Sequence, residues 1–209
     1  TLVVRGNYGL YFGVVLQPQF VAFSAKMDQL PLPLGDEGTS EISLQGRGIY
    51  RNRTNWNMQV NYLTLRNIPQ LAPGSRVELA GTMKPGSFQL NTLKYSDDVS
   101  SLTGNADINF DSLQPFTGNG WINLADGEER EIYRIVGRKE GTDVHANIQI
   151  EAAPLSRFPE VPVEGVVTAG VDITGSYQNP RIDFSINLDE GEFQDGPLLL
   201  ETVGRYRNN

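Results

Sequence analysis

The sequence is poor in the residues that metal sites and many enzymes depend on. Its 209 residues include no cysteine and a single histidine, His145. Without cysteine there is no disulfide framework and no thiolate metal site. One histidine cannot supply a metal cluster, and catalytic triads need partners at suitable spacing. Because alternation places His145 on the polar side of a strand, we interpret it as a solvated surface residue.

Sequence motifs for catalysis are also missing. There is no Gly-x-Ser-x-Gly elbow, no His-Glu-x-x-His and no Gly-rich phosphate loop. The acidic runs 126–131 and 189–195 lack the spacing of a calcium loop, so we interpret them as solvated turns. Asp107 and Asp111 share a wet strand face, where nothing would raise the pKa of one carboxyl for glycosidase chemistry. We therefore predict a protein that is not an enzyme and has no cofactor or metal.

Positive charge and long hydrophobic runs are scarce as well. The 17 Lys and Arg residues against 25 Asp and Glu give a net charge of -8, which argues against nucleic acid as a partner. The longest apolar run, 10–16, is far shorter than the roughly 20 residues of a membrane helix. The chain starts at Thr1 within a strand-like run, so we expect a piece of a longer protein, in which a membrane span could precede it.

What the sequence does contain is alternation of apolar and polar residues. In "GVDITGSYQNPRIDFSINLDEGEF", residues 170–193, the alternation runs up to a turn at Gln178, Asn179 and Pro180 and resumes after it. Successive side chains of a strand point to opposite faces, so each half has one apolar face. This stretch predicts a β-hairpin with one polar, solvent-exposed face and one apolar face.

The same period of two recurs along the chain, for example over 55–62 and 143–151. Turn signals separate these runs, and we count about a dozen strands at the spacing of an antiparallel meander. Only 66–75 and 152–162 read as longer irregular connections. The related stretches "LTGNADINF" and "FTGNGWINL" indicate a repetitive array in which each strand contacts mainly its neighbours.

The C-terminal part of the chain carries a family resemblance. "VDITGSYQNPRIDFSINLDEGEF" resembles the aliphatic-x-Gly-x-x-x-Asn-Pro element and following strand of the TamB family, the inner-membrane component of the translocation and assembly module of diderm bacteria. "LETVGRYRNN" and "LTGNADINF" are similar in style to the same domain. The rest of the chain resembles the family only in its general pattern of alternating strands and turns.

The resemblance implies a fold and a role. The fold is a β-taco, an elongated, curled antiparallel or mixed sheet with a hydrophobic concave face, here a single segment over 1–209. Such proteins are anchored in the inner membrane, cross the periplasm and meet an outer-membrane barrel of the Omp85 class. The implied tasks are phospholipid transport for outer membrane biogenesis and assembly or secretion of outer-membrane proteins and autotransporters. The cargo, phospholipid or an unfolded outer-membrane protein, stays open.

Periodicity by itself leaves two other readings. A β-sandwich interaction or adhesion module alternates in the same way, and a carbohydrate-active all-β enzyme would need convergent carboxylates that we do not find. In the β-taco reading, the apolar positions form a groove that shields acyl chains, at about 0.8 kcal/mol per buried methylene. The residues predicted to line this groove are Val60, Tyr62, Ile108, Phe110, Ile148, Ile150, Ile173, Ile182, Phe184 and Ile186.

Overall fold

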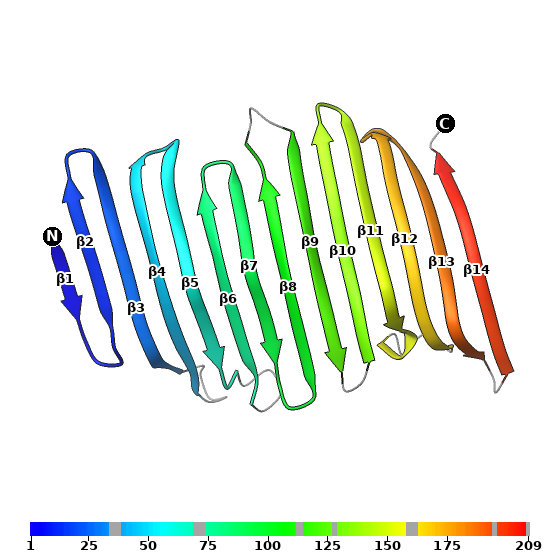
Figure 1. The fold of residues 1–209 in the computed structure, drawn as a ribbon, viewed down its shortest axis with the longest axis horizontal. Helices are drawn as coiled ribbons and strands as arrows, with labels where there is room; N and C mark the ends of the chain where they lie inside the picture. Colours follow the sequence, from blue (N-terminus) through cyan, green and yellow to red (C-terminus); the bar gives the residue numbers. More distant parts are fainter. Residues whose placement is uncertain are drawn as a thin grey trace. The chain divides into compact units, whose positions relative to one another are not determined.

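In the computed structural model, the described residues are 1–33, 39–68, 74–111, 115–126, 129–157, 163–193 and 196–207. They form fourteen β-strands and one short 3₁₀ helix, with no α-helix among them. The strand order follows the sequence from β1 to β14, so strands that are consecutive in the chain are neighbours in the sheet (Figure 1). The prediction of an all-β, antiparallel sheet is confirmed.

The chain divides into two compact units, residues 1–107 and 108–209, which are described separately. Unit 1 contains β1 (Leu2–Arg5), β2 (Tyr11–Gln17), β3 (Phe20–Pro33), β4 (Thr39–Asn52), β5 (Asn55–Arg66), β6 (Arg76–Lys84), β7 (Ser87–Ser96) and most of β8 (Ser100–Asn109). Unit 2 contains β9 (Phe116–Asp126), β10 (Glu129–Glu140), β11 (Asp143–Pro154), η2 (Leu155–Arg157), β12 (Glu164–Ser176), β13 (Asn179–Phe193) and β14 (Gly196–Arg207).

The hairpin predicted at 170–193 is present as β12 and β13. Ile173 pairs with Ile182 and Val171 with Phe184, so the apolar residues of both strands fall on one side. The turn is formed by Tyr177 and Gln178, one residue earlier than the sequence suggested. The Tyr177 N–H donates to the carbonyl oxygen of Thr142 at 2.9 Å, which ties this turn to the neighbouring β10–β11 turn.

In each unit, β-bulges lie at neighbouring positions on several consecutive strands, β3 to β7 in unit 1 and β11 to β14 in unit 2. In unit 1 the pairing shifts at neighbouring points of β3–β4, β4–β5, β5–β6 and β6–β7. In unit 2 it shifts in β11–β12, β12–β13 and β13–β14. Four residues at these bulges have positive φ: Gln29, Ala152, Gly165 and Glu190. A bulge inserts an extra residue and bends its strand, so neighbouring bulges bend the sheet of each unit.

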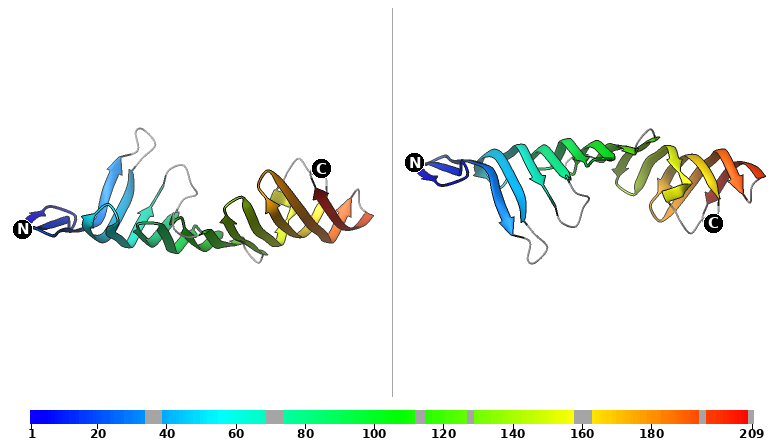
Figure 2. Two further views of the ribbon diagram at one scale, coloured as in Figure 1. Left: turned by 90° about the horizontal axis from the view of Figure 1, so that it is seen from above. Right: turned by 90° about the horizontal axis from the view of Figure 1, so that it is seen from below.

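Each unit is a single layer of strands (Figure 2). The accessible surface is 14,099 Å², whereas two separate compact domains of half this mass would together expose about 11,600 Å². Among the described hydrophobic residues, only Ala153 and Leu188 are buried. The described strands therefore do not form the two packed sheets of a β-sandwich, whose inner faces would be buried.

Candidate functional site

One face of unit 2 gathers apolar side chains from four neighbouring strands, β10 to β13, and we call it the apolar face of unit 2. Residues that are paired across strands point to the same side of a sheet. The register pairs Ile135 with Ile148, Ile148 with Val171, and Val171 with Phe184. Six of the predicted groove residues share this face: Ile148, Ile150, Ile173, Ile182, Phe184 and Ile186.

The apolar face of unit 2 is open. Ile135 is 52% exposed and Ile186 is 37% exposed, although both belong to rows of apolar neighbours. Near one end of the face the ammonium of Lys139 lies 5.3 Å from the ring centre of Tyr177. Apolar area of this kind, exposed and contiguous, usually marks a binding surface.

The opposite face of unit 2 carries polar networks. The Asn147 amide donates to Asp172 at 2.7 Å. The Asp183 carboxylate pairs with Arg205 at 2.5 Å and with Arg181 at 2.7 Å, and the hydrogen bonds from Arg205 and then Arg181 hold the pKa of Asp183 below its usual value. The face is not uniformly polar, because the side chain of Val203, which pairs with Ser185, is on this side and 77% exposed.

Unit 1 has an apolar face of its own. Val60, a predicted groove residue, pairs with Gly46 and Gly81, and the next row along the strands runs through Met27, Leu44, Leu63, Leu79 and Leu93. These residues are half-buried. The described part of unit 1 contains no second layer of strands over them. Within the described segments, each unit thus presents an apolar surface with no second layer of strands over it.

Tyr62 does not lie where the alternation placed it. The bulge in β5 leaves Asn61 unpaired, so Tyr62 pairs with Gln45 instead of sharing the face of Val60. Its hydroxyl donates to Asp28 at 3.1 Å. Partial burial and then this hydrogen bond raise the pKa of Tyr62. The prediction that Tyr62 lines the apolar face is therefore wrong, because one inserted residue moves all later side chains to the other side.

Two predicted residues lie at the boundary between the units. Ile108 is the second-last residue of β8 and is half-buried, while Phe110 follows the strand and is 46% exposed. Their contribution to the apolar face of either unit stays a prediction.

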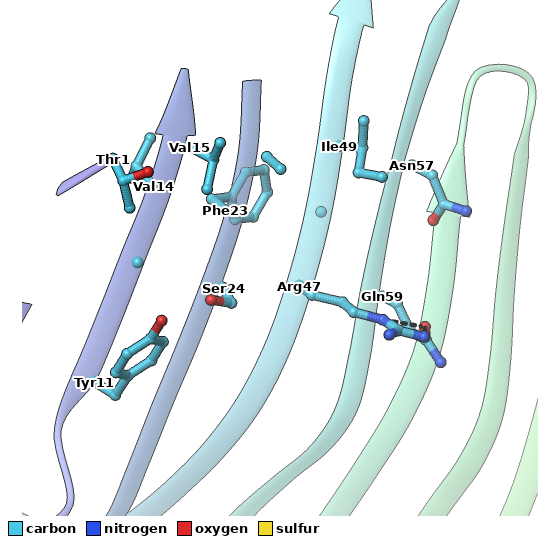
Figure 3. Close-up of a pocket in the computed structure, with 13 residues that line it drawn as sticks. Thr1, Tyr11, Val14, Val15, Phe23, Ser24, Arg47, Ile49, Asn57 and Gln59 are labelled. Carbon is cyan, nitrogen blue, oxygen red and sulfur yellow. Dashed lines mark hydrogen bonds between the residues drawn. The ribbon is translucent and has the colours of Figure 1, made fainter. Parts of the chain in front are cut away.

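A shallow hollow of about 450 Å³ lies mainly on the polar side of unit 1 (Figure 3). Arg47 lies in this hollow, and its Nε and Nη2 donate to the Gln59 side-chain oxygen at 3.1 and 3.0 Å. Tyr11, Ser24 and Ile49 line the same space. A second hollow, of about 570 Å³, is lined in unit 2 chiefly by the polar-side residues Gln149, Thr168, Ser185, Asn187 and Glu201. No hydrogen bond joins a hydroxyl to a carboxylate among the described residues that line either hollow, so we place the candidate site on the apolar faces.

Among the described residues, no three His, Cys, Asp or Glu side chains are grouped so that they could hold a metal ion. The described segments also include no helix that is long and apolar enough to cross a membrane. Comparison of the chain with protein-family models, with curated proteins and with solved structures gave no significant match.

Proposed function

We propose that this chain is a non-enzymatic periplasmic segment of a TamB-like envelope-spanning protein, and that its apolar faces shield phospholipid acyl chains on the way between the two membranes. The observation that supports the proposal is the uncovered apolar surface on each unit, with Ile186 37% exposed within a row of apolar neighbours. A soluble domain with no apolar ligand normally covers such a surface.

The dimensions of the apolar face of unit 2 suit an acyl chain. Ile182, Phe184 and Ile186 occupy successive positions on one side of β13 and span about 14 Å along the strand. The acyl chain of one leaflet occupies about 15 Å, half of the hydrocarbon core. Each methylene that leaves water for such a surface contributes about 0.8 kcal/mol.

The same faces could also assist the assembly of outer-membrane proteins beside a barrel of the Omp85 class. Lipid is the cargo that the geometry favours, because the apolar faces offer side chains and not unpaired backbone groups. An unfolded barrel strand binds best to a sheet edge, where backbone hydrogen bonds are free. We therefore take phospholipid as the cargo and protein assembly as the second role.

Photo-crosslinking in cells tests the proposal on the full-length protein. A photoreactive residue at Ile186 on the apolar face should recover phospholipid, whereas one at Ser185, the next residue on the opposite face, should recover little. Both side chains are exposed, so accessibility does not distinguish them. Equal lipid labelling from the two positions would contradict a role of the apolar face.

A matched pair of charge variants tests whether the face is used. Ile186→Asp should impair outer-membrane integrity, since an unpaired carboxylate next to hydrocarbon must either lose its hydration or bring water onto the surface along which the acyl chain moves. Ser185→Asp adds the same charge on the other face and should leave integrity unchanged. Circular dichroism of both variants establishes that they fold. Full function of a folded Ile186→Asp protein would remove the basis of the proposal.

A further inference from the structure

Three turns lie together at one end of unit 1, at the top of Figure 1: β2–β3, β4–β5 and β6–β7. Beside them, cross-strand pairing places Leu16, Val21, Tyr50 and Trp56 in one row on the apolar side. Leu16 is 69% exposed and Tyr50 is 46% exposed. This end of unit 1 therefore presents aliphatic and aromatic side chains to solvent.

The same end also carries cations, each of them without an ion pair to a described acidic residue. Arg51, Arg53 and Lys84 are exposed, and the described residues include no ion pair to any of them. The turn sequences 17–20, 51–55 and 84–87 contain no Asp or Glu. Elsewhere in unit 1, Lys26 pairs with Asp28 at 2.9 Å and Arg76 pairs with Glu78.

The basic end of unit 1 stands out against the charge of the whole chain. Residues 108–209 contain 17 acidic and 8 basic residues, a net charge of -9, whereas residues 1–107 contain 8 acidic and 9 basic residues, a net charge of +1. An anionic surface should therefore repel the protein as a whole. Attraction to such a surface would have to be local, because charges farther away than about 10 Å are screened.

We propose that Arg51, Arg53, Lys84, Tyr50 and Trp56, which we call the turn rim, dock unit 1 on the surface of a membrane that contains anionic phospholipid. Arg and Lys near a membrane attract anionic headgroups, and Tyr and Trp favour the interface between headgroups and hydrocarbon. The two basic hairpins lie about 10 Å apart at the usual strand spacing, so their cations reach different headgroups. This spacing favours a bilayer surface over a single bound lipid.

Vesicle co-sedimentation of the 209-residue chain tests the proposal. Binding is measured to vesicles of phosphatidylcholine mixed with phosphatidylglycerol and to vesicles of phosphatidylcholine alone. We expect binding to the anionic vesicles that is stronger and that weakens as salt is added. The double variant Arg51→Gln/Arg53→Gln should bind about 30-fold more weakly, from about five-fold for each lost cation.

The matched control is Arg5→Gln/Lys94→Gln, which removes two cations of unit 1 that lie outside the turn rim and should keep full binding. Trp121→Phe leaves Trp56 as the only tryptophan, whose emission should shift to the blue on anionic vesicles. The proposal would be overturned if the chain bound no vesicles or bound both kinds equally. It would also be overturned if the control variant lost as much binding as the double variant, or if the emission of Trp56 did not shift in the protein that sediments with vesicles. The lipid-shielding role is tested separately at Ile186 in unit 2, so either proposal can fail alone.

Discussion

The ring of Phe23 lies directly over Gly48 on the neighbouring strand, and this contact gives a sharp test of how the single-layer sheet is stabilised. Phe23 and Gly48 are paired across β3 and β4. A Cβ atom added to Gly48 would lie 2.3 Å from Phe23 Cζ and 2.7 Å from Cε1. Ordinary contact needs more than 3.4 Å, so Gly48→Ala must displace the ring by more than about 1 Å.

The size of the effect follows from the exposed area. A displaced ring that loses about one third of the area a Phe usually buries, on the order of 60 Å², costs about 1.5 kcal/mol. A strained rotamer adds about 0.5–1.5 kcal/mol, while replacing Gly by Ala returns about 0.4–1 kcal/mol by restricting the unfolded chain. We expect Gly48→Ala to destabilise unit 1 by about 1–2.5 kcal/mol.

Differential scanning calorimetry can measure this effect, which corresponds to a fall of several degrees in the melting temperature of a domain this size. Gly118→Ala is the matched control, because its nearest described heavy atom, Phe116 Cε1, is 3.9 Å away, and it should be neutral or stabilising. Phe23→Leu should relieve the clash, so Gly48→Ala should cost less in that background. An unchanged melting temperature, or the same cost with Leu at 23, would refute the reasoning.

Two further predictions concern one ion pair and one close backbone contact. The hydrogen bond from Lys26 lowers the pKa of the folded Asp28 carboxyl below its usual value of 3.8. Asp28→Asn should therefore be less stable than the wild type at neutral pH, and the difference in stability should vanish as the pH falls through this lowered pKa. Acid unfolding curves of both proteins measure the difference, and a difference that stays constant with pH would contradict the prediction. Gly191→Ala should cost about 1–3 kcal/mol, since its Cβ would lie 2.2 Å from the Leu198 carbonyl oxygen; hydrogen exchange along β14 should rise, with Gly196→Ala as the control, and unchanged exchange would contradict it.

The alternation of apolar and polar residues was enough to predict the sheet and much of the apolar face of unit 2. It held there because β12 and β13 stay in register from the Val166–Asp189 pair to the Ser176–Asn179 pair, so each side chain keeps its parity. Four predicted residues consequently share a face, and the unbroken pairing of β11 with β12 over the same stretch adds Ile148 and Ile150. The hairpin at 170–193 was recognised for the same reason, since a polar turn separates two uninterrupted runs.

Bulges are what the sequence did not reveal. The run from Trp56 to Tyr62 alternates without a break, yet the chain inserts Asn61 and turns Tyr62 toward Asp28. The position of a bulge depends on the partner strands on both sides, which a pattern within one strand does not contain. Ala152 also has a positive φ. Alanine has no special preference for this backbone conformation, so the sequence did not predict it either.

An open apolar face is compatible with a stable fold because a single-layer sheet is stabilised by contacts between side chains that are paired on neighbouring strands. Each cross-strand pair contributes about 0.2–1 kcal/mol, and backbone groups are satisfied within the sheet. Ile186 is already 37% exposed, so replacing it removes only part of a small contribution. Ile186→Asp, however, places a hydrated carboxylate between Ala169 and Thr202 on the apolar face. Loss of function without loss of the fold is therefore the expected result of changing this face, whereas a closed core would lose both together.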